Sequence, residues 1–137
     1  AQTILQGLVF LLIGRVQRWR QVASEESSPQ QEFIQKIRLY LEHHAEESYE
    51  IGWLEAQSPF GHDYVSRMFK KVYGISPHSY HAHRKLDLAG KLLQETDATI
   101  TEIAERLHFS SIHYFSRGFK AYMGEQPSLY RERRRRL

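Results

Sequence analysis

The chain contains a serine, an arginine and a lysine that occur twice with the same spacing. The two sets, 50 positions apart, are Ser66, Arg67 and Lys70, and Ser116, Arg117 and Lys120. Arginine holds guanine through two hydrogen bonds, serine donates or accepts at base edges and phosphates, and lysine pairs with phosphate oxygens. The pattern therefore predicts contact with nucleic acid, made by two similar surfaces.

The repeat extends well beyond these polar residues. YVSRMFKKVYGISPHSY, residues 64–80, recurs as YFSRGFKAYMGEQPSLY, residues 114–130. The other shared positions are Tyr64 and Tyr114, Phe69 and Phe119, Gly74 and Gly124, Pro77 and Pro127, and Tyr80 and Tyr130. A repeat of this quality at a fixed offset predicts two copies of one structural unit.

Helical periodicity places the polar residues of each copy on one face. At about 100° per residue, one side of each helix is apolar and the other is polar. The expected inner residues are Val65, Met68, Phe69 and Val72 in the first copy and Phe115, Phe119 and Tyr122 in the second. The expected outer residues are Asp63, Ser66, Arg67 and Lys70 in the first copy and His113, Ser116, Arg117 and Lys120 in the second. In one copy alone, the Ser-Arg-Lys pattern could simply be a solvent-facing helix surface. Because the pattern recurs in the same register, it favours a recognition helix.

The remaining elements that must position these faces are also helical. Pro77 opens a long helix, Gly74 ends the helix before it, and Thr99 with Glu102 forms a capping box. No stretch alternates for long enough to predict a strand. The sequence therefore predicts an all-α fold of two helix-turn-helix units joined by a long linking helix. The expected helices cover about 28–46, 51–56, 62–73, 77–94, 99–107, 111–122 and 127 into the arginine cluster.

A further amphipathic helix is expected over residues 3–22, followed by a polar linker. Its apolar stripe would pack against a neighbouring or upstream domain, or form a dimer seam. The run from Leu8 to Ile13 is too short to span a bilayer, so no membrane segment is expected. Because the chain begins at Ala1 without Met, we expect a processed chain or a fragment of a longer one. The predicted divisions are 1–27, the helix and linker; 28–76, the first unit; 77–96, the linking helix; and 97–137, the second unit with a basic tail.

Charge is distributed unevenly along the 137 residues. The net charge is only +3, but residues 30–60 carry a balance of −4 and residues 98–137 a balance of +4. A polyanion would therefore meet the second unit more readily. Arg133 to Arg136 are expected to form a frayed tail that attracts phosphate or is simply solvated. The absence of cysteine fits a reducing cytoplasm and excludes disulfides and thiolate metal sites.

Residues 100–131, ITEIAERLHFSSIHYFSRGFKAYMGEQPSLYR, resemble the signature of the AraC/XylS transcription regulators. KLDLAGKLL, residues 85–93, is similar to the family's linking helix, and the resemblance covers about residues 30–135. It implies a seven-helix DNA-binding domain whose two recognition helices enter successive major-groove segments, about 34 Å apart. It also implies promoter DNA and RNA polymerase as partners, activation rather than repression, and a sensing or dimerisation domain upstream.

Helix position makes Lys70 and Lys120, one turn after the arginines, better placed for phosphate. The resemblance assigns base-reading roles to other positions. The base-reading candidates are His62, Asp63, Ser66 and Arg67 in the first unit and Ile112, His113, Ser116 and Arg117 in the second.

The first unit departs from the family pattern at several positions. Leu54-Glu55 stands where the family prefers an aliphatic residue and Ala, and Ser58-Pro59 stands where an apolar residue and Gly are usual. Glu55 would have to reach solvent or find a partner, and Asp63 has the wrong charge for phosphate. The second unit should therefore read more sequence than the first. The rival reading is a degenerate interaction module that docks a partner protein and no longer reads DNA.

Other chemistry finds little support in the sequence. His78 and His81 could share a helix face, but His83 points elsewhere, so we expect no metal site. The residues Glu102, Glu105 and His108 are expected to be helix surface. No phosphate-binding glycine loop, nucleophile elbow or paired-carboxylate motif is present, so neither an enzyme activity nor a cofactor is expected.

Overall fold

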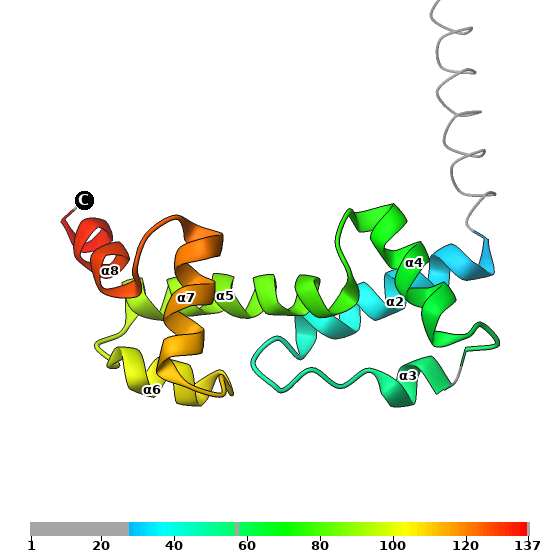
Figure 1. Cartoon of the computed structure of the whole chain (residues 1–137), viewed down its shortest axis with the longest axis horizontal. Helices are drawn as coiled ribbons and strands as arrows, with labels where there is room; N and C mark the ends of the chain where they lie inside the picture. Colours follow the sequence, from blue (N-terminus) through cyan, green and yellow to red (C-terminus); the bar gives the residue numbers. More distant parts are fainter. Residues whose placement is uncertain (1–27, 57, 137) are drawn as a thin grey trace, which may run out of the picture. The chain divides into compact units, whose positions relative to one another are not determined.

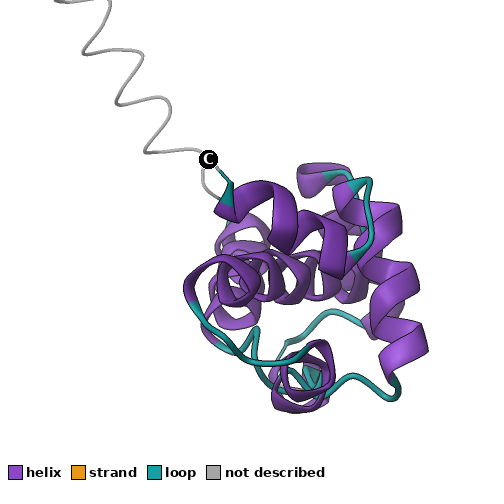
Figure 2. Ribbon diagram, turned by 90° about the vertical axis from the view of Figure 1, so that its left-hand side faces the viewer, coloured by secondary structure: helices purple, strands orange, loops and turns teal. Residues whose placement is uncertain are grey.

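In the computed structural model, residues 28–56 and 58–136 are described, and within them every regular element is a helix (Figures 1 and 2). The predicted all-α architecture of two helix-turn-helix units and a linking helix is confirmed. The amphipathic helix predicted over residues 3–22 lies outside the described residues. The helices are α2 (Pro29–His43), α3 (Gly52–Ala56), α4 (His62–Tyr73), α5 (Pro77–Glu95), α6 (Ile100–Arg106), α7 (Ile112–Met123) and α8 (Pro127–Arg135).

The chain divides into two compact parts, residues 1–33 and 34–137. The second part contains the paired helices of both helix-turn-helix motifs, α3 with α4 and α6 with α7. Its C-terminal half packs around one apolar cluster, in which α5 contributes Leu86, Ala89 and Leu93. The other buried members of this cluster are Ile103, Ala104, Leu107, Phe115, Phe119 and Tyr130. The inner side of the linking helix thus supplies the core against which α6, α7 and α8 are held.

The sequence repeat is reproduced as a structural repeat. Gly74 and Gly124 follow α4 and α7 with φ of 82° and 89°, a left-handed conformation that glycine adopts without steric cost. Their N–H groups donate to the carbonyls of Lys70 and Lys120, so each helix ends in the same hydrogen bond. Both recognition helices therefore have the same length and the same stop.

A pair of aromatic residues anchors each recognition helix. Phe69 of α4 meets Tyr80 edge to face, with ring centroids 5.5 Å apart and an interplanar angle of 78°. Phe119 of α7 meets Tyr130 in the same way, at 5.2 Å and 83°. Edge-to-face pairs of this kind add to the burial energy of the rings. The repeated Phe and Tyr of the sequence are thus the contact between each recognition helix and the helix that follows it.

The predicted inner face of α4 is wrong at Val72, whose exposed fraction is 50%. Val72 lies in the last turn of α4. Its counterpart in α7 is Tyr122, whose hydroxyl donates to Asp87 at 2.9 Å and whose ring stacks on His83 at 4.4 Å. Valine has neither the reach nor the polar atom for these contacts, so the end of α4 remains less covered.

Candidate nucleic-acid interface

The ten residues predicted to contact DNA all lie on α4 or α7. Within each helix the buried side chains are Val65 and Phe69, or Phe115 and Phe119, and the predicted residues surround the opposite side. The exposed members are His62, Asp63, Arg67, Lys70, Ile112, His113, Arg117 and Lys120, and the half-buried members are Ser66 and Ser116. The two sets occupy equivalent positions of two helices of equal length, α4 and α7, which are labelled in Figure 1.

The N-terminal ends of the two recognition helices differ. Ser111 caps α7, since its side chain accepts a hydrogen bond from the Tyr114 N–H at 3.0 Å. The corresponding residue before α4 is Gly61, which provides no side-chain cap. A serine cap satisfies one of the free N–H groups at a helix start and is worth about 1 kcal/mol. The first turn of α7 is therefore better fixed than that of α4.

Glu55, the unusual residue of α3, has a partner on the first recognition helix. Its carboxylate Oε2 lies 2.5 Å from Nδ1 of His62, and its side chain is only 11% exposed. The other oxygen, Oε1, is buried and has no hydrogen-bond partner among the described residues. The hydrogen bond and charge of Glu55 raise the pKa of the exposed His62 imidazole. One of the base-reading candidates of the first unit is thus already engaged within the protein.

The two arginines at the centre of the repeat are held differently. Arg67 Nε donates to the backbone carbonyl of Asp63 at 3.3 Å, so the side chain lies along its own helix. Within the described part of the chain, no hydrogen bond or ion pair involves the side chain of Arg117. The guanidinium of the second unit is therefore free of contacts within the described residues, whereas that of the first is tied at Nε to its own helix.

The turn of the second unit contains a strained residue that the sequence analysis assigned only to the surface. His108 has φ of 59°, a left-handed conformation that is uncommon outside glycine and costs about 1 kcal/mol or more. Its Nδ1 donates to the Glu46 carbonyl at 2.7 Å, across 62 positions of sequence. Arg106 also approaches Glu46, at 3.8 Å between Nη2 and Oε1. These contacts join the turn of the second unit to the loop after α2.

The C-terminal arginines do not form the frayed tail that was expected. Helix α8 continues through Arg135, and Arg135 pairs with Asp97 at 3.0 Å. Each remaining member of the run also has a partner within the chain. The contacts are Arg133 with Glu125 at 3.2 Å, Arg136 with Glu132 at 2.5 Å, and Arg134 over the Tyr130 ring at 4.9 Å. Two of these partners, Glu132 and Tyr130, lie four positions before their arginines on α8, whereas Asp97 and Glu125 are brought near only by the fold.

No group of three or more histidine, aspartate or glutamate side chains in the described part of the chain could hold a metal ion. None of the described helices is long and apolar enough to cross a membrane.

A family model described as a helix-turn-helix domain matches residues 59–133, more than half of the chain. The transcriptional activator AarP of Providencia stuartii is 30% identical over 102 residues, which make up 74% of this chain and 76% of AarP. By contrast, the chain spans only 38% and 31% of the length of two other curated relatives.

Solved structures of related regulators have the same fold as this chain. The C-terminal domain of AraT, a response regulator from Geobacillus stearothermophilus, superimposes with a TM-score of 0.69 at 32% identity. The match covers 80% of this chain and 88% of that domain. A probable AraC family regulator from Rhodopseudomonas palustris has the same TM-score at 25% identity, with 76% of this chain and 98% of that one covered.

Proposed function

Because this chain belongs to the AraC/XylS family of DNA-binding transcription regulators, we propose that α4 and α7 enter two successive major-groove segments of promoter DNA. The observation that carries this proposal is the duplicated helix itself. In both copies a buried phenylalanine side faces the core, and the opposite side carries an exposed arginine and lysine beside a half-buried serine. Base contacts in the major groove and phosphate contacts on either side require this division of faces.

Within this arrangement, the second unit carries most of the sequence readout. Arg117 is its principal base contact, because its guanidinium has five donors and no competing partner in the described residues. His113 and Ser116 flank it on the same face, and Lys120 pairs with phosphate one turn later. The first unit contributes more to positioning. His62 is engaged by Glu55, while the backbone carbonyl of Asp63 accepts from Arg67.

The regulatory consequence of binding is proposed to be activation through RNA polymerase. Support comes from AarP, which is named a transcriptional activator and of which this chain covers three quarters. A homodimer, formed through residues 3–22 or through an upstream domain, would place two such readers on one promoter. We propose a cytoplasmic location, since that is where bacterial promoter DNA lies.

Electrophoretic mobility with fragmented genomic DNA at low salt tests whether the chain binds DNA. The variant carrying Arg117→Ala and Lys120→Ala should lose most of the mobility shift. Lys36→Ala removes one charge from an exposed position of α2 and should leave the shift unchanged. A shift that survives the double substitution would contradict the assignment of α7 as the main reader. No shift in the parent chain would instead favour a domain that docks a partner protein.

A further inference from the structure

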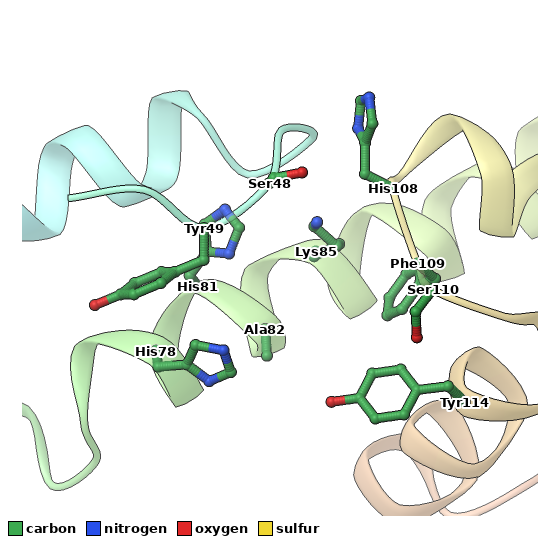
Figure 3. Close-up of a pocket in the computed structure, with 10 residues that line it drawn as sticks. All are labelled: Ser48, Tyr49, His78, His81, Ala82, Lys85, His108, Phe109, Ser110 and Tyr114. Atoms are coloured by element: carbon green, nitrogen blue, oxygen red, sulfur yellow. The ribbon is translucent and has the colours of Figure 1, made fainter. Parts of the chain in front are cut away.

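A cavity of about 260 Å³ lies between the two helix-turn-helix units (Figure 3). Three segments line it: the loop before α3, the N-terminal half of α5, and the connection between α6 and α7 together with the first turn of α7. The residues are Ser48, Tyr49, His78, His81, Ala82, Lys85, His108, Phe109, Ser110 and Tyr114. None of the residues that read DNA in the proposal above lines this space.

The basic group of the cavity is Lys85, a lysine that is only 7% exposed. Its Nζ lies 5.5 Å from the centroid of the Phe109 ring, and no carboxylate of the described residues approaches it within 4 Å. Burial lowers the pKa of this ammonium group. A buried charge without a counterion is costly, and an anion in the cavity would offset part of that cost.

The neighbouring polar groups do not supply the missing negative charge. His81, which is 3% exposed, uses Nε2 to donate to the His44 carbonyl at 2.9 Å. His108 Nδ1 is occupied by the Glu46 carbonyl. Among the ten lining residues there is no aspartate or glutamate. The charge of Glu47, which pairs with His44 at 3.0 Å, acts on His81 only weakly compared with burial.

The rest of the lining is aromatic or carries hydroxyl groups. Tyr49, Phe109 and Tyr114 contribute rings, and Ser110 contributes a hydroxyl at an exposed position. Tyr114 is 53% exposed, so the cavity opens at the side of α7 while Lys85 is buried inside. In Figure 3 the Lys85 side chain extends between the loop that carries Ser48 and the turn that carries Phe109.

We propose that this cavity binds a small organic anion whose carboxylate pairs with Lys85 and whose apolar body lies among the three rings. The volume is just below the roughly 300–1,000 Å³ of ordinary ligand pockets, which sets the size at that of a small metabolite. Because both helix-turn-helix units line the space, the bound anion bridges them. The inference is independent of the DNA-binding proposal, since it concerns a different set of residues.

Thermal unfolding with phenylacetate as the probe tests the site. Phenylacetamide serves as the uncharged comparison, and sodium chloride holds the ionic strength constant. A ligand present at ten times its Kd stabilises a domain of this size enough to raise Tm by about 4 °C or more. We expect a saturable rise with phenylacetate and a much smaller one with phenylacetamide.

Two substitutions on α5 separate the site from general salt effects. Lys85→Met retains a long unbranched side chain but removes the buried ammonium group, so it should abolish the rise of Tm. Lys91→Met removes an exposed charge from the same helix and should leave the rise unchanged. Tyr114→Ala removes an exposed ring from the lining. It should raise the phenylacetate concentration that gives half of the maximal rise of Tm by about twofold to tenfold. An equal rise of Tm in Lys85→Met, or no saturable rise in the parent chain, would overturn the proposal.

Discussion

The carboxylate of Glu55 and the imidazole of His62 face each other at 2.5 Å, one on α3 and the other at the start of the first recognition helix. Glu55 occupies a position that normally packs against the recognition helix, and His62 is the partner that its carboxylate finds there. The contact also leaves a negative charge beside the residue that would otherwise be available to DNA. The two helix-turn-helix units therefore share one scaffold, and under the proposed function they present unequal reading surfaces.

This contact predicts a pH dependence of stability. The folded-state pKa of His62 is raised, so the native state binds more proton than the unfolded state as pH rises above about 6.5. The stabilisation is complete below that pH and is lost as pH rises through the folded pKa. Urea unfolding midpoints between about pH 6 and pH 8 should therefore fall more in the parent chain than in His62→Gln.

Two comparisons make that measurement specific. Glu55→Gln should remove the same component as His62→Gln, because it removes the partner. His113→Gln, on the exposed face of α7, should leave the parent profile unchanged. His81 works in the opposite direction, since burial lowers its pKa, but it is present in every variant. Identical pH profiles for the parent and Glu55→Gln would refute the pairing.

The unequal surfaces predict unequal costs for the two central arginines. Arg117→Ala should weaken binding to a selected duplex by about 1–3 kcal/mol, the usual value of a bidentate base contact. Arg67→Ala should cost less than about 1 kcal/mol, because Arg67 already bonds the Asp63 carbonyl. The measurement is the dissociation constant of the parent chain and of each variant for the same duplex at one fixed salt concentration. Equal losses would mean that the first unit reads as much sequence as the second.

Arg131 predicts a structural effect at the C-terminus. Its guanidinium donates to the carbonyls of Leu93 at 3.1 Å and Ala98 at 2.5 Å, so it ties α8 to the connection between α5 and α6. Hydrogen bonds of charged groups are worth about 1.5–3 kcal/mol, so Arg131→Ala should lower the free energy of unfolding by about 2 kcal/mol or more. Arg131→Lys should recover only part of this loss, because lysine lacks the planar fork.

Arg134 provides the matched control for that experiment. It lies over the Tyr130 ring at an exposed position, where such a contact is worth about 0.5–1 kcal/mol. Arg134→Ala should therefore change the denaturant midpoint only slightly. A loss as large as that of Arg131→Ala would show that the carbonyl contacts of Arg131 are not what holds α8.

The run from Arg133 to Arg136 predicts an effect on salt dependence. The arginines of its ion pairs lie at exposed positions, where each pair is worth about 0–1 kcal/mol, so DNA phosphates can replace the acidic partners. Replacing the four arginines by alanine should reduce the slope of log K against log salt by about 0.9 or more, the value of one phosphate contact. An unchanged slope would mean that these residues serve only the fold of α8.

Helical periodicity and helix-capping residues in the sequence were sufficient to predict the helices of the described residues. Gly74, Gly124 and the capping box at Thr99 are local devices, and the structure contains each of them where the sequence predicts it. Side-chain pairing was harder to foresee. The partner of Glu55 is seven positions away, and that of His108 is 62 positions away, so only the folded backbone brings them together. The same reason explains why the cavity at Lys85 was not predicted.

Selection of bound duplexes from a random-sequence DNA pool would show whether both recognition helices read sequence. We expect strong enrichment of one block read by α7 and weaker enrichment of a second block about one helical turn, or ~34 Å, away. Arg117→Ala should relax the strong block, and Arg67→Ala should affect only the weak one. Enrichment of two equally strong blocks would contradict the inequality of the units, and no enrichment at all would contradict sequence-specific DNA recognition.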